Sequence, residues 1–449
     1  MADWQIVAGG VTAPKGFRAA GITAGLKPSG LPDLALIVSD VDAIAAGVFT
    51  TSHVHAACVS ICRQNLKAKP YARAILCNAG QANASTGKQG WADAVESAEI
   101  LAKALNISPE LILQASTGVI GQRIRMDALR SGIPKAVAAL SETGSEDAAR
   151  SIVTTDLVTK TIALEMKIGD RPVRIGGIAK GSGMIHPNMA TMLSFVTCDA
   201  AVSPHLWQDM LTRAANKSFN QITVDGDTST NDSLIALANG QSRTPVITTM
   251  NADAERLEAM LTEVCRYLAK SIARDGEGAT CLIEVQVTGA LNDVAARLIA
   301  KTVAGSSLTK AAIYGRDPNW GRIAGAAGRA GVAFDQNQLE IWLGDYQLLK
   351  EGQPLEFDRV AANAYMTAQA EASAHPLKSR AVISSENSNE LQVLEGNLPT
   401  VFERETATVQ FVNHPVVITL SIGNGPGNGA AWGCDLSYDY VKINAEYTT

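Results

Sequence analysis

The sequence contains no apolar run of the roughly 20 residues that a membrane-spanning helix needs. It also lacks a basic start followed by an apolar core, so we expect neither a secretory leader nor a membrane anchor. There is no excess of positive charge: the net charge of −6 disfavours nucleic acid or an anionic membrane surface as a partner. These absences predict a cytoplasmic protein that acts on small molecules, with a local basic pocket for any acidic substrate.

The sequence also lacks the two ligand pairs that a zinc site needs. Cys58 and Cys62 lie just after His53 and His55, but no second cysteine or histidine pair follows at zinc spacing. The stretch 54–62 is instead typical of a strand, so we expect no metal site. The number of cysteines is odd and their surroundings are hydrophobic, which predicts reduced core thiols at Cys58, Cys62, Cys77, Cys198, Cys265, Cys281 and Cys434.

With 449 residues, of which 46% are hydrophobic and 18% charged, the chain can form one large domain or two to three ordinary ones. Short β-branched runs alternate with amphipathic stretches, which predicts a mixed α/β fold without a regular βαβ rhythm. In 254–274, apolar residues recur at steps of three and four, so one helix face is buried. The expected strands are 34–39, 74–78, 173–179, 192–199, 280–288 and 416–422, and the expected helices are 91–105, 124–140, 206–217 and 254–274.

Two glycine-rich stretches superficially resemble nucleotide-binding motifs. In 176–183, GGIAKGSG, the lysine precedes its glycine, unlike the lysine of a phosphate-binding loop. In 423–429, GNGPGNG, asparagine stands where the dinucleotide fingerprint needs its third glycine. We expect a bend between strands at the second stretch and no nucleotide site at either.

The segment 180–195, KGSGMIHPNMATMLSF, places Thr191 directly after the small residue Ala190. A threonine hydroxyl is a weak nucleophile, but an N-terminal threonine has its own α-amine as a base, with an ordinary pKa near 8. Self-cleavage between Ala190 and Thr191 would create that amine. The alternative from these residues alone is a buried strand over 189–196 that happens to contain a threonine.

A second stretch, 114–122, QASTGVIGQ, offers a hydroxyl at Thr117 and a backbone N–H at Gly118. Two such donors that converge on one point form an oxyanion hole. Taken alone, the stretch is more typical of a plain turn between two helices than of an oxyanion hole.

Several longer motifs together resemble one family. They are KGSGMIHPNMATMLSF, TTD at 154–156, ITVDGDTSTND at 222–232, RDGEGAT at 274–280, GRDPNWGRI at 315–323 and the C-terminal AWGCDLSYDYVKINAEYTT. The opening GFRAAGITAGLKPSGLPDLALIVSD and GVFTTSHVHAA match in the same way. The chain therefore resembles the ornithine acetyltransferase family, the bifunctional glutamate N-acetyltransferases of arginine biosynthesis, from residue 16 to residue 449.

The resemblance implies a precursor that cuts itself between Ala190 and Thr191. It would yield an α chain of 1–190 and a β chain of 191–449, with two such pairs in a heterotetramer. The implied fold is a layered helix and sheet sandwich, similar to N-terminal nucleophile hydrolases but with a different connectivity.

The family's roles carry over by position. Thr191 would be the nucleophile, with Thr117 and Gly118 as the oxyanion hole. Acetyl would pass from N-acetylornithine to Thr191 and then to glutamate in a ping-pong reaction, without metal or resident cofactor. Some members also use acetyl-CoA as donor, and no residue of this sequence decides that point. The positions that match substrate contacts are Thr154, Lys180, Thr191, Glu277, Asn444 and Thr449.

Two alternatives stay open from the sequence. A self-cleaving aminopeptidase of a related fold would use the same nucleophile and pass the acyl group to water, although Lys180 and Glu277 favour an amino-acid acceptor. A non-enzymatic descendant of the family would remain uncut. One departure from the family is a polar stretch over 375–412, which we interpret as an insertion upstream of the C-terminal contacts.

Overall fold

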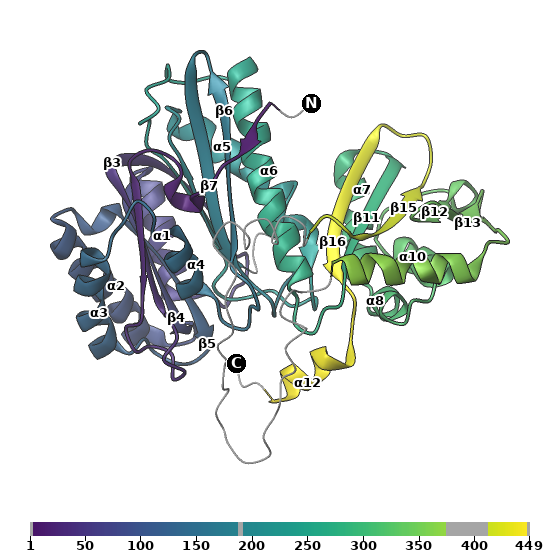
Figure 1. Ribbon diagram of the computed structural model, residues 1–449, viewed down its shortest axis with the longest axis horizontal. Coiled ribbons are helices and arrows are strands. Elements are labelled where there is room, and N and C mark those ends of the chain that lie inside the picture. The colour runs from purple at the N-terminus through teal and green to yellow at the C-terminus, as the bar shows by residue number, and fades with distance from the viewer. Residues whose placement is uncertain (1–2, 187–191, 374–411, 447–449) are drawn as a thin grey trace.

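The computed structural model describes residues 3–186, 192–373 and 412–446, in which two β-sheets lie side by side (Figure 1). The first sheet has the order β1-β6-β7-β8-β10-β3-β4-β5, and β2 also pairs with β3. Its members are β1 (Gln5–Ile6), β2 (Phe17–Ile22), β3 (Leu34–Phe49), β4 (Tyr71–Gln81), β5 (Ile112–Val119), β6 (Lys160–Ile168), β7 (Arg171–Lys180), β8 (Leu193–Cys198) and β10 (Ser233–Ala238).

Helices cover both faces of this sheet because its central strands are apolar on both sides. In β10, Leu234 and Ala236 pack into the core beneath α5 and α6, whereas Ile235 and Leu237 pack on the opposite side, beneath α1 and α4. This layered α/β sandwich confirms the predicted fold class. The helices are α1 (Ala57–Ala68), α2 (Gly87–Leu105), α3 (Met126–Ala138), α4 (Ser145–Ile152), α5 (Pro204–Asn216) and α6 (Ala252–Arg274).

The second sheet has the order β14-β13-β12-β15-β11-β16-β9. One face packs against α7 (Asp293–Ala304), α8 (Ser307–Tyr314), α9 (Trp320–Gly328) and α10 (Arg359–Ala372), and the short α12 (Tyr438–Glu446) follows the sheet. The strands are β9 (Ile222–Thr223), β11 (Leu282–Ala290), β12 (Glu340–Leu343), β13 (Tyr346–Lys350), β14 (Gln353–Pro354), β15 (Val416–Ser421) and β16 (Gly427–Cys434).

Helix α6 lies between the two sheets (Figure 1). The Asn251 side chain caps its start by accepting a hydrogen bond from the Ala254 N–H. Its apolar stripe packs on β6 and β7, and Lys270 on another side reaches Glu284 of β11 at 3.0 Å. The end of α6 thereby brings the turn with Asp275 and Glu277 close to the end of β7.

The position between residues 190 and 191 falls between neighbouring strands of the first sheet. β7, which precedes it, pairs antiparallel with β8, which follows it. β8 in turn pairs parallel with β10, and β10 pairs antiparallel with β3. The expected division into 1–190 and 191–449 remains a prediction, and it runs through one sheet rather than between two globular units.

The structure corrects two local predictions. The stretch 54–62 is not a strand, because α1 begins at Ala57 and buries Cys58 and Cys62 on one helical face. The stretch 114–122 is not a plain turn, because β5 continues to Val119 alongside β4. The bend expected over 423–429 does join β15 to β16.

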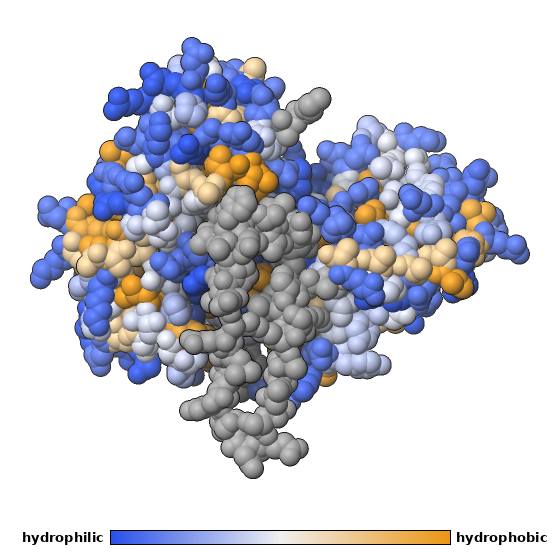
Figure 2. Space-filling model, viewed as in Figure 1, coloured by the Kyte–Doolittle hydropathy of each residue, from blue (hydrophilic) through white to orange (hydrophobic). Residues whose placement is uncertain are grey.

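On the side shown in Figure 2, hydrophilic residues predominate, and apolar residues form several separate patches among them. None of the helices in the described residues is long and apolar enough to cross a membrane. The seven cysteines are all buried as free thiols, as predicted.

Candidate active site

A cavity of about 170 Å³ lies where β5, β7 and β8 meet the turn after α6 and helix α12. Six of the predicted site residues line it: Thr117, Gly118, Thr154, Lys180, Glu277 and Asn444. These residues are up to 327 positions apart in the sequence, from 117 to 444, so only the fold brings them together. Ala190, Thr191 and Thr449 lie outside the described residues, although Met192, which follows Thr191 in the chain, also lines the cavity.

Thr117 and Gly118 lie near the end of β5, where the strand approaches β4 closely. Gly118 has φ +123°, and a Cβ there would lie 2.3 Å from the carbonyl carbon of Gly80. A larger residue would therefore push the two strands apart. The Thr117 hydroxyl accepts a hydrogen bond from Lys180 Nζ at 2.9 Å, which leaves its own O–H proton available to donate into the cavity.

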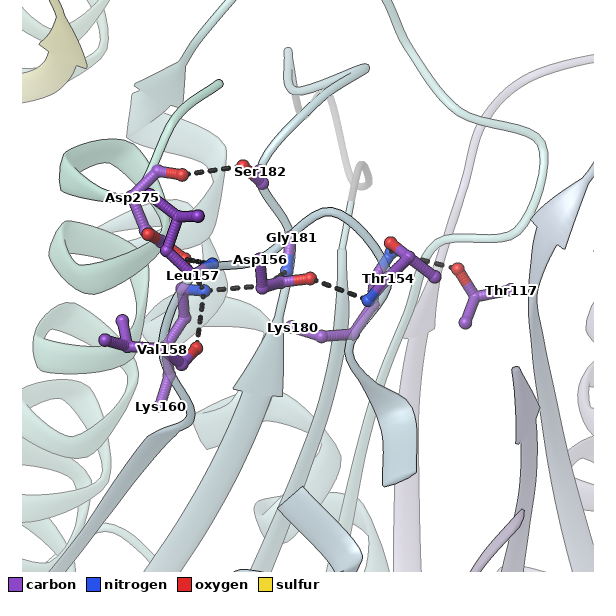
Figure 3. Close-up of polar contacts among 10 residues, drawn as sticks. All are labelled: Thr117, Thr154, Asp156, Leu157, Val158, Lys160, Lys180, Gly181, Ser182 and Asp275. Atoms are coloured by element: carbon purple, nitrogen blue, oxygen red, sulfur yellow. Dashed lines mark hydrogen bonds and ion pairs between the residues drawn. The ribbon is translucent and has the colours of Figure 1, made fainter. Parts of the chain in front are cut away.

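Lys180, the last residue of β7, supplies a cation whose protein partners are neutral. Its half-buried ammonium donates to the Thr117 hydroxyl and, at 3.4 Å, to the Thr154 hydroxyl (Figure 3). It forms no ion pair within the described part of the chain. An ammonium in a half-buried cavity with only hydroxyl partners is well placed to bind an anion such as a carboxylate.

Behind Thr154 and Lys180, three buried charges form a cluster (Figure 3). Lys160 Nζ lies 2.6 Å from Asp156 Oδ1 and 2.6 Å from Asp275 Oδ2, and all three side chains are fully buried. Asp156 also accepts hydrogen bonds from the backbone N–H groups of Thr154 and Gly181, at 3.0 and 2.6 Å. The cluster thus holds the two segments that carry the polar residues of this wall.

Several carboxylates also line the cavity. Glu277 is nearly buried, at 7% exposure, and its Oε2 accepts a hydrogen bond from Asn444 Nδ2 at 2.8 Å. Gly183 allows this carboxylate to pack closely, because a Cβ at that position would lie 2.5 Å from it. Asp225 and Asp227 line the same cavity. The cavity therefore contains both a cation and carboxylates, which suits a substrate with both an acidic and a basic group.

Asp225 is a site residue that sequence reasoning did not single out. Its carboxylate accepts backbone hydrogen bonds from Met184 at 2.6 Å, Ile185 at 2.9 Å and Asp227 at 3.1 Å. Burial raises its pKa, and these hydrogen bonds oppose the rise. Burial also raises the pKa of the Tyr440 hydroxyl, with a further contribution from the neighbouring carboxylates. The sequence signal for Asp225 is its place in the motif 222–232.

Asn231, which the sequence analysis also did not identify as a site residue, joins two parts of the cavity wall. Its buried side-chain amide donates to the carbonyls of Ala82 and Ser116, at 2.6 and 2.8 Å. It thus attaches the 225–232 loop to the strand that carries Thr117. The sequence signal for Asn231 is its place in the same motif, 222–232.

No group of three or more His, Cys, Asp or Glu side chains that could hold a metal occurs among the described residues. Of the two histidines that precede Cys58, His55 has hydrogen-bond partners in the protein. Its Nδ1 lies 3.1 Å from the Ser52 carbonyl oxygen and its Nε2 lies 2.9 Å from the Ser60 hydroxyl.

A sequence profile of the ArgJ family matches residues 18–378 and 370–449. The chain belongs to the ArgJ family. The arginine biosynthesis bifunctional protein ArgJ 1 of a Nostoc species is 71% identical over 450 residues, covering 100% of both chains. A protein of the same description from Synechocystis is 65% identical over 449 residues, again over 100% of both. Among family members of known structure, the ornithine acetyltransferase of Mycobacterium tuberculosis, solved with ornithine, is 42% identical over 42% of this chain and 100% of that one, at a TM-score of 0.40.

The family profile and the relatives also test whether the polar stretch 375–412 is an insertion in this chain. The two parts of the family profile meet at residues 370–378, close to where this stretch begins. The Nostoc and Synechocystis relatives nevertheless align along their whole length, over 450 and 449 residues. A segment of similar length is therefore shared with these relatives and is not peculiar to this chain. Its residues up to 411 lie outside the described part of the structure.

Proposed function

We propose that the chain is an acetyltransferase of arginine biosynthesis that moves acetyl from N-acetylornithine to glutamate, giving ornithine and N-acetylglutamate. Membership of the ArgJ family and relatives described as bifunctional proteins of arginine biosynthesis support this function. They favour it over the aminopeptidase alternative. The observation that carries the proposal is a single cavity lined both by the Lys180 ammonium and by the Glu277 carboxylate with its partner Asn444.

In the first half-reaction, the Thr191 hydroxyl would attack the acetyl carbonyl of N-acetylornithine. The free α-amine of the same residue would take the hydroxyl proton and pass it to the leaving nitrogen. The amide C–N bond breaks and a threonine ester forms. Thr117 O–H and Gly118 N–H would stabilise the oxyanion between these states.

In the second half-reaction, the amine of glutamate would attack the threonine ester, forming N-acetylglutamate and restoring the hydroxyl. Donor and acceptor share an α-carboxylate, which Lys180 would bind in both steps. The carboxylate wall around Glu277 would receive the side-chain ammonium of ornithine or assist proton transfer. Acetyl-CoA would be an alternative donor to the same threonine if the chain is bifunctional. No step calls for a metal or resident cofactor.

This mechanism requires self-cleavage between Ala190 and Thr191, because only cleavage gives the threonine its basic amine. We propose that an α chain of 1–190 and a β chain of 191–449 then remain together, and that two pairs form a cytoplasmic heterotetramer. The hydrogen bonds between β7 and β8 support continued association, since these strands lie on opposite sides of the cleavage position.

Mass spectrometry of the purified protein, before and after addition of N-acetylornithine, tests the proposal. We expect a fragment that begins at Thr191 and gains one acetyl group, which glutamate then removes as N-acetylglutamate. Thr191→Ala should remain uncut and inactive, whereas the matched control Thr367→Ala, on the surface of α10, should behave as wild type. Free acetate without N-acetylglutamate would instead identify a hydrolase, and one persistent uncut band would contradict an active enzyme.

A further inference from the structure

The Lys180 ammonium faces the cavity although a carboxylate lies close behind it. Asp156 accepts a hydrogen bond from the N–H of Gly181, the residue next to Lys180, at 2.6 Å. The two charges interact, because Lys180 contributes to lowering the pKa of Asp156. An ammonium beside an unneutralised buried carboxylate would pair with it, since that pairing offsets the cost of burying both charges. Lys180 instead donates to the hydroxyls of Thr117 and Thr154.

Lys160 accounts for this arrangement. Its fully buried ammonium lies 2.6 Å from Asp156 Oδ1, the same oxygen that accepts from Gly181 (Figure 3). The other oxygen of Asp156 accepts from the Thr154 N–H. Both oxygens of Asp156 therefore have partners, and one partner is the Lys160 ammonium, which also pairs with Asp275.

The charge state of Asp156 agrees with this geometry. Burial alone would raise its pKa, but Lys160 first and Lys180 second lower it, and the pKa is about 2. Asp156 is thus a carboxylate at neutral pH and needs a cation. Burial lowers the pKa of Lys160, but Asp156 and Asp275 raise it, so Lys160 stays protonated and supplies that cation.

We propose that Lys160 is a positioning residue: by pairing with Asp156, it leaves the Lys180 ammonium directed into the cavity to bind the α-carboxylate common to acetyl donor and acceptor. This inference rests on the proposed function. Without Lys160, the nearest remaining cation for Asp156 is Lys180, which would turn away from the cavity. Both substrates would then lose the same charge-assisted contact.

The test compares steady-state kinetics of wild type and Lys160→Met, which has a similar length and no charge. We expect KM for N-acetylornithine and KM for glutamate to rise together, by about tenfold, because a hydrogen bond to a charged group is lost in ground state and transition state alike. For the same reason kcat should change by less than about threefold. Lys270→Met, which breaks a partly buried pair with Glu284 away from the cavity, is the matched control and should leave both KM values unchanged.

A second substitution separates positioning from a merely structural role. In Lys160→Met combined with Asp156→Asn, the competing carboxylate is gone, so both KM values should return toward wild type. A structural role for Lys160 predicts the opposite, because the double variant has lost more hydrogen bonds. If Lys160→Met does not fold, Asp156→Asn alone decides: we expect its KM values to stay within about threefold of wild type, and a rise as large as that of Lys180→Ala overturns the inference.

The outcomes distinguish the inference from the proposed function. A wild-type protein that transfers no acetyl group refutes the function. An active wild type with unchanged KM values in Lys160→Met, or a double variant no better than the single one, refutes only the role of Lys160.

Discussion

Asp275 offers a test of the buried charge cluster that does not depend on catalysis. Its Oδ2 accepts hydrogen bonds from Lys160 and from the Leu157 N–H, whereas Oδ1 is buried without a partner among the described residues. Burial raises the pKa of Asp275 from 3.8 to about 6, although Lys160 opposes the rise. Asp275→Asn would keep the shape of the side chain and remove the charge.

The sign of the effect follows from proton binding. The folded protein binds this proton more tightly than the unfolded chain does, so its ionisation lowers the free energy of unfolding as the pH rises from about 4 through about 6. The full difference between the two pKa values corresponds to about 3 kcal/mol, of which about 1.4 kcal/mol develops between pH 5 and pH 8. Asparagine has no such ionisation. The stability of Asp275→Asn relative to wild type should therefore increase by about 1.4 kcal/mol over that range.

Urea unfolding of both proteins at pH 5 and pH 8, followed by tryptophan fluorescence, measures this difference. Comparing the two proteins at each pH cancels the groups that titrate in both. A stability difference that is constant with pH, or that shrinks toward pH 8, would refute the assignment of a raised pKa to Asp275.

Three further predictions concern the cavity. Gly118→Ala should abolish acetyl-enzyme formation and lower the melting temperature, because the methyl group would meet the backbone of β4. The control Gly121→Ala has open space around it and should lower the free energy of unfolding by only about 1 kcal/mol, because of its positive φ. Lys180→Ala should raise KM for both substrates by about tenfold or more in steady-state kinetics, and unchanged KM values would remove Lys180 from the site. Asn444→Ala should lower kcat/KM by roughly tenfold through the lost contact with Glu277, without changing the circular dichroism spectrum.

Much of the fold was predictable where one pattern dominated a segment. The stretch 254–274 became α6 because its apolar residues recur at helical spacing, and the apolar run 192–199 became β8. β6 was missed because its alternating Ala, Leu, Glu, Met and Lys residues also suit a helix, so pairing with β7 decides its conformation. α1 was misread because its buried stripe is short and rich in residues that also favour strands.

The candidate site was predictable only through the matching motifs. Residues at 117, 180, 277 and 444 have no spacing that places them together, and the cavity exists because β5, β7 and the end of α6 converge. The buried cluster of Asp156, Lys160 and Asp275 was even harder to predict from the sequence. Asp156 and Lys160 are four residues apart, an ordinary separation for a surface pair, and their burial depends on Asp275, which lies 115 residues further along the chain.

The interleaving of strands in the first sheet sets an order of events for a chain that cuts itself. β8 and β10 lie between β7 and β3, so strands from both sides of residue 190 alternate across the sheet. Neither portion could assemble that sheet alone, so folding would have to precede a cut at this position. Once made, the cut would release no fragment, because separation would require breaking hydrogen bonds on both edges of the β8 and β10 pair. Unfolding would then be hard to reverse, since two free chains would have to find each other to rebuild one sheet.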